Sequence, residues 1–314
     1  MIRYVLRRLA LLVITLLITS VLIFALTQLL PGDVARLILG REAQPEAIAA
    51  LREELGLNEP VIQQYTNWLT GFIMGDWGTS FANGSAPIRP LVLARLGDSL
   101  KLALMTLVFA VPLSIALGVI AGLRENTPVD ASISVFSLAV VGLPEFVTGL
   151  VLINVVALGT GTFPASSMPP GPNIGDWFRQ LTLPALTATF VLLAYIVRLT
   201  RAGVIDELKK PYVRTAVLKG LPQRTVIVKH VLRNALLPTI TVIALSFGWL
   251  IGGLIVIENV FSYPGLGRLM VAAVERKDVP LLQAVVMVVV FFFAISNLIA
   301  DVLYALLNPR IRLG

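Results

Sequence analysis

The chain has 314 residues, of which 57% are hydrophobic and only 14% are charged, a balance too apolar for an ordinary soluble domain. It has no cysteine and a single histidine, His230, which excludes disulfides, thiolate metal sites and a histidine-rich metal centre. The formal net charge of +7 would allow nucleic-acid binding, but membrane topology explains most of the basic excess, so we expect no nucleic-acid partner.

Long apolar stretches predict membrane-spanning helices. A helix of about 20 residues, rising about 1.5 Å per residue, crosses about 30 Å of hydrocarbon. Helices are favoured over a membrane barrel because the sequence lacks the alternating pattern of barrel strands. The predicted fold class is an all-α membrane protein with six transmembrane helices, at about residues 9–30, 99–122, 132–158, 181–200, 235–257 and 281–306.

Residues 1–30 combine a basic start with an apolar run, which is also the pattern of a signal peptide. The run is longer than the apolar region of a signal peptide, and no Ala-x-Ala cleavage site follows it. We therefore interpret residues 1–30 as an uncleaved N-terminal transmembrane helix.

The distribution of Lys and Arg predicts the orientation. The short segments on one side, which include the N-terminus, residues 201–234 and the tail at 307–314, hold most of these cations. By the positive-inside rule, both termini and the 201–234 segment are expected in the cytoplasm. The core at 99–306 then holds five spans and this cytoplasmic segment, and membrane lipid is an expected contact.

Residues 31–98, between the first two spans, form a predicted small external helical subdomain. Two short helices are indicated, one at about 45–56 and one in "EPVIQQYTNWLTGFIMG". In the second helix Tyr65, Trp68 and Phe72 share one face. We favour packing of this stripe onto the spans, or at the membrane interface, over ligand binding.

The later spans contain helix-weakening and small residues. Pro112, Pro144 and Pro184 permit kinks where neighbouring helices satisfy the freed carbonyls. The Gly-x-x-x-Gly motifs at 118–122 and 248–252 indicate either tight helix packing or pairing of two chains.

Polar side chains within the spans are candidates for a solute pathway. Glu145 falls near the middle of the third span, where an ionised carboxylate is costly unless it faces water, a cation or a partner. The equally weighted alternative is a kinked helix whose break turns Glu145 toward an aqueous vestibule. Asp301 is expected to pair with a nearby cation such as Arg198. The pathway candidates are Glu145, Asn154, Ser246 and Trp249.

The 201–234 segment combines eight Lys or Arg residues with regular helix breaks. Pro211 suits a first helical turn, Gly220 suits the residue after a helix end, and Pro222 suits a second start. The pattern predicts a helix near 211–219, a turn, and a second helix leading into the fifth span. Contact with anionic lipid would explain the charge but not the breaks or the interleaved apolar residues, so docking against a protein is favoured.

Part of this segment, "RTAVLKGLPQRTVIVKHVLRNALLP", resembles the cytoplasmic EAA loop of ABC importer permeases, the coupling element that fits a cleft on the ATP-hydrolysing subunit. Arg214, Thr215 and Ala216 stand at the Glu-Ala-Ala positions, and Gly220 stands at the Gly position. The Arg and Thr resemble the peptide/nickel branch of these permeases. The resemblance implies contact with the ATPase by Tyr212, Val213, Arg214, Thr215, Ala216, Lys219 and Gly220.

Other stretches are similar to the DppB/OppB (dipeptide/oligopeptide/nickel) type of permease. They are "ELGLNEPVIQQYTNWLTGFIMGDWGTSF", "VIENVFSYPGLGRLMVAAVERKDVPLLQ" and "DVLYALLNPRIR". Because these stretches occur in the right order along most of the chain, the resemblance is specific to this type.

The resemblance implies that the chain forms half of a translocation pathway for peptides or a similar small solute. Its expected partners are a second homologous permease, two ABC ATPase subunits and an external solute-binding protein. No Gly-x-x-x-x-Gly-Lys-Ser/Thr loop occurs, so we expect no enzyme and no cofactor in this chain, with ATP and Mg on the ATPase partners. The helix at 211–220 is expected to act as a rigid lever on spans four and five.

The stretch "ENVFSYPGLGR" is a Gly- and Pro-rich turn suited to re-entering the membrane edge as part of an external gate. An ordinary loop is the alternative. Glu258 is expected to cap or anchor the turn. The gate candidates are Glu258, Phe261, Tyr263, Pro264, Gly265 and Gly267.

Two other classes of protein compete with this interpretation. A secondary transporter or channel independent of ATP is favoured by an inverted repeat or several deep ionisable groups, and we find no convincing repeat and one clear deep acid. An intramembrane enzyme needs a catalytic constellation or metal ligands within the membrane, and no catalytic or metal site is predicted. The cargo stays open among dipeptides, oligopeptides, nickel chelates, glutathione and other small solutes.

Overall fold

The computed structural model describes residues 2–28, 43–54 and 56–307. The described residues are helical apart from loops and one antiparallel hairpin of β1 (Thr79–Ser80) and β2 (Ala86–Pro87). The all-α class is therefore confirmed for them. Parts of the predicted external segment (29–42) and cytoplasmic tail (308–314) lie outside the described residues.

Four helices are long and apolar enough to cross a membrane: α1 (Ile2–Gln28), α5 (Ile88–Leu123), α8 (Ile174–Leu208) and α15 (Val279–Leu307). Two further candidate spans are bent helix pairs, Pro128–Gly142 with Glu145–Leu158 and Gln223–Ala235 with Leu237–Gly253, bent by 102° and 50°. The described part of the chain thus holds four to six candidate spans.

The predicted third span, residues 132–158, is not one continuous helix. α6 (Pro128–Gly142) ends before Leu143, and α7 (Glu145–Leu152) begins after Pro144 and continues as a π-helical segment, η2 (Ile153–Leu158). Leu143 is extended, with φ of −86° and ψ of 134°, because a proline disfavours the helical region for the residue before it. Pro112 and Pro184, in contrast, lie inside helices that continue through them.

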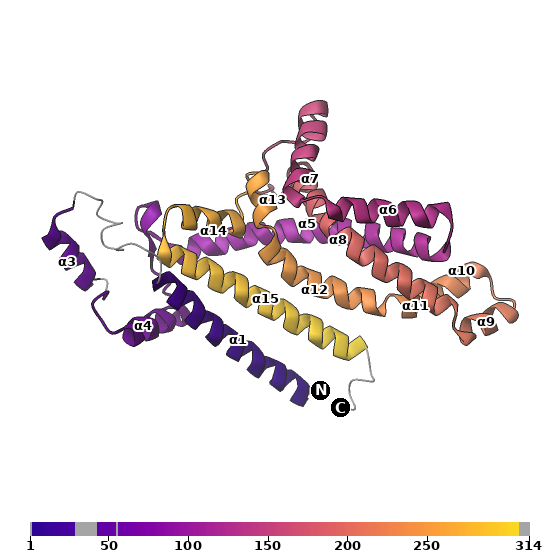
Figure 1. The fold of residues 1–314 in the computed structure, drawn as a ribbon, viewed down its shortest axis with the longest axis horizontal. Helices are drawn as coiled ribbons and strands as arrows, with labels where there is room; N and C mark the ends of the chain where they lie inside the picture. The colour runs from indigo at the N-terminus through magenta and orange to yellow at the C-terminus, as the bar shows by residue number, and fades with distance from the viewer. Residues whose placement is uncertain (1, 29–42, 55, 308–314) are drawn as a thin grey trace.

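Short helices lie at both ends of the molecule. Figure 1 shows α9 and α10 at one end of the molecule and α3 and α4 at the other. The short elements are α3 (Pro45–Glu54), α4 (Val61–Met74), the 3-10 turn η1 (Phe81–Asn83), α9 (Pro211–Leu218), α10 (Gln223–Thr225), the π-helical η3 (Val226–Val231), α11 (Leu232–Ala235), α12 (Leu237–Gly253), α13 (Ile255–Val260) and α14 (Leu266–Glu275).

Helices α5 and α8 pack closely through the first Gly-x-x-x-Gly motif. A Cβ atom on Gly118 would lie 2.6 Å from Cβ of Thr200, and one on Gly122 would lie 2.8 Å from Cβ of Val204. Real Cβ atoms do not approach so closely, so a larger residue at either position would push the two helices apart. This motif serves packing within the chain.

The second motif also faces a helix of the same chain. A Cβ atom on Gly248 of α12 would lie 2.9 Å from Cβ of Ser296 on α15. At both motifs, then, the structure favours tight packing over the alternative of pairing two chains.

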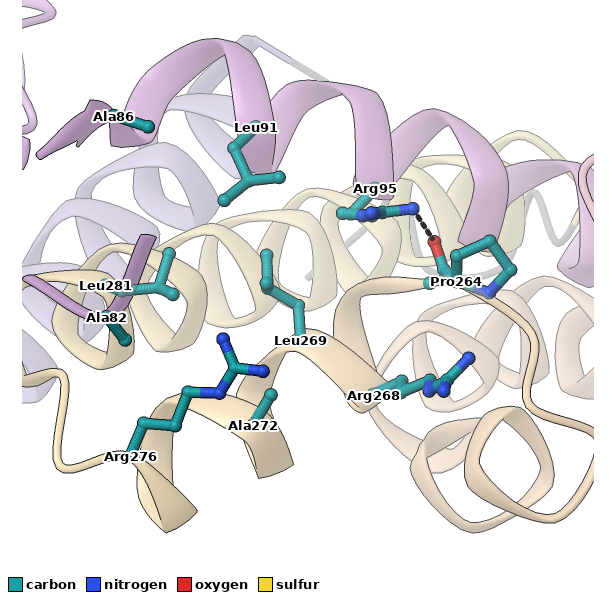
Figure 2. A pocket seen from close by; sticks show the side chains of 11 residues that line it. Ala82, Ala86, Leu91, Arg95, Pro264, Arg268, Leu269, Ala272, Arg276 and Leu281 are labelled. Carbon is teal, nitrogen blue, oxygen red and sulfur yellow. Dashed lines mark hydrogen bonds between the residues drawn. The ribbon is translucent and has the colours of Figure 1, made fainter. Parts of the chain in front are cut away.

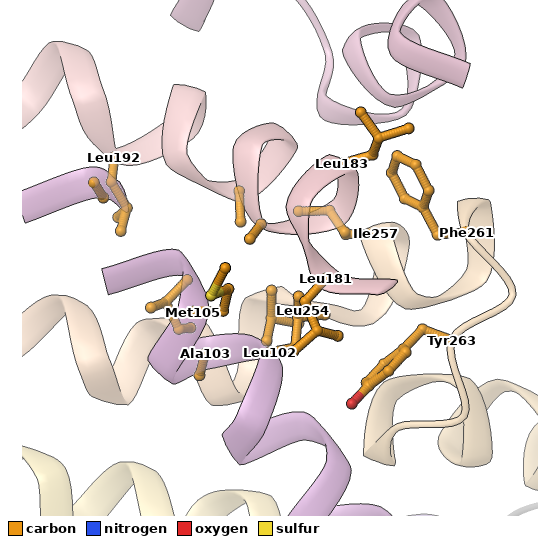
Figure 3. Packing of buried hydrophobic residues seen from close by; sticks show 14 of the residues in the cluster. Leu102, Ala103, Met105, Leu181, Leu183, Leu192, Leu254, Ile257, Phe261 and Tyr263 are labelled. Atoms are coloured by element: carbon orange, nitrogen blue, oxygen red, sulfur yellow. The ribbon is translucent and has the colours of Figure 1, made fainter. Parts of the chain in front are cut away.

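The largest group of buried side chains lies between α5, α8, α12 and α13 (Figure 3). Its members are apolar and come from helices far apart in the sequence, so they fix the arrangement of the long helices. The cluster includes Leu102, Leu181, Leu254, Ile257, Phe261 and Tyr263.

The aromatic stripe of α4 packs onto α1. The ring centroid of Phe24 lies 5.5 Å from that of Tyr65 and 5.8 Å from that of Trp68, and the Tyr65 and Ser20 hydroxyls are 2.8 Å apart. Phe72 continues the stripe. The interpretation of this stripe as packing onto the spans is confirmed.

Asp301 pairs with a cation, as predicted, but the cation is not the suggested Arg198. The Asp301 carboxylate lies 3.1 Å from the guanidinium of Arg8. The reason is that α15 packs beside α1, so the cation comes from the first helix and not from α8. Figure 1 shows the start of α1 and the end of α15 near each other.

We expect Gly118→Ala to lower the thermal unfolding temperature of the purified chain in detergent. Overpacking a tight contact typically costs about 1–3 kcal/mol. The matched control is Gly97→Ala on the same helix, where an added Cβ meets nothing within 4 Å. The control should gain about 0.5–1 kcal/mol, because alanine is a better helix former than glycine. Equal unfolding temperatures for the two variants would contradict the packing argument.

Candidate functional site

Helix α9 has the ends that the sequence predicts. It begins at Pro211, and Gly220 follows its C-terminal end with φ of +74°, a conformation that favours glycine. The amide of Gly220 donates to the carbonyl of Val217 over 2.9 Å, and that of Leu221 donates to Ala216 over 3.3 Å. The turn at the end of α9 is therefore closed by its own backbone.

The inner face of α9 is fixed to the protein. Val213 and Ala216, one turn apart, are buried in a cluster with Val204, Val226 and Val231. These two coupling candidates thus face the body of the chain. Their burial holds α9 against the body of the chain.

The outer face of α9 carries apolar and cationic side chains together. Val217 is 59% exposed and Leu218 is 79% exposed. The coupling candidates Arg214, Thr215 and Lys219 are also exposed. Val217 and Leu218 are absent from the predicted coupling set. On the helix Leu218 lies opposite the buried Val213 and Ala216, and Val217 lies at the edge of that buried face.

Tyr212 ties α9 to both neighbouring helices. Its hydroxyl donates to the carboxylate of Glu207, lies 3.2 Å from the carbonyl of His230 and accepts from the amide of Asn234 over 3.0 Å. Burial and the hydrogen bond to Glu207 raise the pKa of Tyr212, so the hydroxyl keeps its proton. Tyr212 therefore acts as an internal link.

The two ends of the 201–234 segment are held together. A Cβ atom on Gly203 would lie 2.5 Å from the carbonyl oxygen of Ala235, so α8 and α11 are in backbone contact. The hydroxyls of Thr200 and Thr239 are 3.2 Å apart in the same buried region. Because both ends are clamped and α9 is packed between them, the segment forms a closed unit.

Two ion pairs join this unit to the turn between α5 and α6. Arg201 donates two hydrogen bonds to Asp130, of 2.6 and 2.7 Å, and the Asp130 side chain is only 6% exposed. Lys209 lies 3.3 Å from Glu125 in a more exposed pair. Sequence reasoning missed Asp130 and Arg201. Asp130 stands three residues after Thr127, a helix-capping spacing, but that signal does not reveal a partner on another helix.

At the other end of the molecule, Glu258 anchors the predicted gate turn. The residue is 1% exposed, and its carboxylate accepts hydrogen bonds from the Ser99 hydroxyl over 2.6 Å and from the Arg268 amide over 3.1 Å. A Cβ atom on Gly265 would lie 2.1 Å from a carboxylate oxygen of Glu258. Glu258 thus holds the turn at its centre, and Gly267 is also buried.

The aromatic gate candidates lie inside the protein (Figure 3). Phe261 and Tyr263 are fully buried, and the Tyr263 hydroxyl donates to the carbonyl of Asp98 over 2.9 Å. Pro264 is half-buried, and its carbonyl accepts from Arg95 over 3.3 Å. In this conformation these residues pack the turn against α5, and a role in gating stays a prediction.

The pathway candidates lie on three elements, α7, η2 and α12. Glu145 is half-buried at the start of α7, just after the break, and Asn154 is exposed on η2. Ser246 is buried on α12, and Trp249 on the same helix is 42% exposed. None of them lines any of three cavities of the described chain, which lie beside α14, beside α4, and between α1 and α15. The structure does not bring the four together within one chain.

Comparisons with known proteins identify the family. Residues 114–313 match the family "Binding-protein-dependent transport system inner membrane component", and residues 1–117 match the N-terminal region of such membrane components. The chain belongs to this family.

Curated relatives include the glutathione transport system permease protein GsiC of Escherichia coli (strain K12) and of Salmonella choleraesuis (strain SC-B67). Each is 38% identical over 313 residues, covering 99% of both chains. Among solved structures, a crystal structure of an amino acid ABC transporter with histidines is 17% identical and covers 70% of this chain and 94% of that one. Its TM-score of 0.47 is too low to support an argument.

Membership of the family makes this chain a permease subunit of an ABC importer in the inner membrane. The family implies an ATPase, a solute-binding protein and a second permease as partners, and the relatives are permease subunits rather than enzymes. An ATP-independent transporter and an intramembrane enzyme are therefore set aside.

We expect Arg201→Gln to destabilise the purified chain, because it leaves the buried Asp130 carboxylate without its cation. The loss should fall toward the lower end of about 3–5 kcal/mol, since the Arg201 side chain is partly exposed. Thermal unfolding in detergent measures it.

Two companion variants test the cause of that loss. Lys209→Gln, in the exposed pair with Glu125, should change stability by less than about 1 kcal/mol. Adding Asp130→Asn to Arg201→Gln should recover part of the loss, because no buried charge then stays unpaired. No recovery in the double variant would show that Arg201 matters for another reason.

Proposed function

We propose that this chain forms one half of the pathway of an ATP-driven importer for small peptides or a similar solute such as glutathione, and that its ATPase docks on the outer face of α9. The observation that carries the proposal is the exposure of Val217 and Leu218, flanked by Arg214 and Lys219, on a helix whose opposite face is buried. Exposed apolar side chains grouped on one face favour a protein partner over water.

The surroundings of α9 support its role as a lever. The inner face is packed, Tyr212 links it to α8 and to α11, and Gly203 joins α8 to Ala235 by backbone contact. A force on α9 therefore moves α8 and α12 with little deformation of the segment between them. The Arg201–Asp130 pair extends the same connection to α6.

The proposed topology has six spans, with α6, α7 and η2 counted as one and α12 as another, and both termini in the cytoplasm. It is supported by the position of α9 and α10 at the end opposite the helices α3 and α4 (Figure 1). It is also supported by the Arg8–Asp301 ion pair, which places the start of α1 beside the end of α15. The basic 201–234 segment and the basic N-terminus then share one side.

The proposed assembly contains this chain, a second homologous permease, two ABC ATPase subunits that hold ATP and Mg, and an external solute-binding protein. The break at Pro144 leaves large apolar side chains of α7 and η2 exposed, among them Phe146 and Leu150. Glu145 and Asn154 lie on these same elements. A pathway between two permeases would explain why the pathway candidates line no closed cavity in one chain.

The proposed cargo is a peptide-like solute. The relatives GsiC are named for glutathione transport, and glutathione is itself a short peptide derivative. At 38% identity, dipeptides, oligopeptides and nickel chelates remain the alternatives, to be separated by transport measurements.

We expect Leu218→Asp to abolish co-purification of the permease with its ATPase while leaving the thermal unfolding of the permease alone unchanged. A carboxylate at this exposed position does not disturb the fold, but it would place an unpaired charge in the apolar centre of the interface. The matched control is Ile62→Asp on the external helix α4, where the side chain is 78% exposed. Retention of the ATPase by the Leu218 variant would refute docking on this face.

We expect Glu145→Gln to lower ATP-dependent uptake several-fold without loss of the assembled complex, because the neutral amide no longer presents a charge to the pathway. Uptake of radiolabelled glutathione and of a dipeptide into proteoliposomes, with the binding protein present, measures the effect and the cargo together. Glu53→Gln, on the exposed surface of α3, is the control. Unchanged uptake would return Glu145 to a structural role at the helix break.

A further inference from the structure

A cavity of about 470 Å³ lies between the start of α5, the whole of α14 and the start of α15 (Figure 2). Its floor is apolar and includes Leu91, Leu269 and Leu281. Its size falls in the range of about 300–1,000 Å³ that is typical of small-molecule sites. A solute of the size of a short peptide would fit it.

The cavity is rimmed by the cations Arg95, Arg268 and Arg276 and is lined by no acidic residue of the described chain. Arg95 and Arg268 each donate to a backbone carbonyl, of Pro264 and Ser262, which positions the guanidinium groups without neutralising them. In Figure 2, Arg95 and Arg268 lie near Pro264, and Arg276 lies toward the other end of the floor. The site thus combines positive charge at its ends with an apolar middle.

The buried carboxylates near the cavity have hydrogen-bond partners of their own. Asp278 accepts from the Ser80 hydroxyl and from the Ala82 amide. Glu258 is 1% exposed and is directed at the Ser99 hydroxyl and the backbone amide of Arg268. Asp98 is buried as well and pairs with Lys101. The guanidinium groups of Arg95 and Arg268 therefore remain available to an anion that enters from solvent.

The cavity lies beyond the hydrocarbon part of α5. This helix has 36 residues and is about 54 Å long, whereas the bilayer core needs only about 30 Å. Its apolar run begins after Lys101, so Arg95 lies in the extension on the side of α4 and the β1–β2 hairpin. A water-soluble ligand can reach the site from that side.

We infer that this cavity is a carboxylate-binding site, in which Arg95 and Arg268 hold a carboxylate of a small soluble solute over the apolar floor. Guanidinium groups form strong, charge-assisted hydrogen bonds with carboxylates, and the apolar floor accepts the rest of a short peptide. The inference rests on the proposed import function and adds to it the chemical group by which the permease itself contacts its cargo.

The test measures equilibrium binding of two solutes to the full chain in nanodiscs of neutral phosphatidylcholine, without the binding protein. The probes are glutathione and trialanine, each compared with an analogue whose carboxylates are blocked, glutathione diethyl ester and trialanine amide. At least one probe should bind, and its blocked analogue should bind at least about tenfold more weakly, the factor expected for the loss of a charge-assisted hydrogen bond.

Substitutions then locate the site. Arg95→Gln and Arg268→Gln should each weaken binding by about tenfold or more, whereas Arg268→Lys should retain part of it. Arg179→Gln is the control, because Arg179 is an exposed external cation outside the cavity. Two independent variants keep the test valid if one of them fails to fold.

Several outcomes would overturn the inference. These are binding by neither solute, equal binding of the blocked analogues, or equal binding by the arginine variants and the Arg179 control. Two further results would also overturn it. If phosphatidylglycerol displaced the solute from these arginines, the ligand would be a lipid head group. If the same arginines bound the solute-binding protein without its solute, the site would be a protein-docking surface. If the carboxylate site is refuted but ATP-dependent uptake persists, the proposed import function still stands. If the solute binds normally but no ATP-dependent uptake occurs, the import function is refuted and the carboxylate site is not.

Discussion

The close approach of α5 and α8 is the constraint on which the rest of the structure depends. Gly118 and Gly122 bring the backbone of α5 against Thr200 and Val204 with no room for another carbon. This contact fixes α8, and α8 in turn carries the central core at one end and the clamp at Gly203 at the other. A shift of a few tenths of an ångström at the glycines would therefore be felt in both regions.

The position of α8 explains how an event at α9 can reach distant parts of the chain. At 35 residues this helix is about 52 Å long and continues through Pro184. Near one end, Gly203 is in backbone contact with Ala235, the Thr200 hydroxyl lies beside that of Thr239, and Arg201 pairs with Asp130. The other end contributes Leu181 and Leu183 to the core around Phe261. A rigid helix fixed at both ends passes on displacement, so the surroundings of α9 and the turn at Phe261 are mechanically connected.

Local signals predicted much of this arrangement. Pro211 and Gly220 set the ends of α9, the spacing of Tyr65 and Trp68 predicted a packed stripe, and Pro144 marked the break in the third span. These features depend on residues near one another in the sequence, where capping, helical periodicity and the missing proline amide act directly.

Long-range partners could not be predicted in the same way. Asp130 and Arg201 are 71 residues apart, and neither has a local pattern that names the other. Asp301 was assigned to the wrong cation because the choice depends on which helix packs beside α15. The inner and outer faces of α9 likewise depend on tertiary packing, so the coupling candidates could be located on the helix but not divided between its two faces.

The charges of Glu258 and Arg268 are kept apart in a way that connects the turn at Glu258 to the cavity beside α14. If Glu258 formed an ion pair with the guanidinium of Arg268, that side chain would be turned inward and the cavity would lose a cation. Instead Glu258 accepts hydrogen bonds from the backbone amide of Arg268 and from the Ser99 hydroxyl, and the guanidinium of Arg268 lies on the rim. The backbone of Arg268 is therefore fixed by a hydrogen bond to the buried Glu258, while its side chain is exposed to solvent. Because the two contacts share one residue, an anion bound at the guanidinium of Arg268, as proposed, would also act on the turn that Glu258 anchors, and α8 packs against the core around that same turn.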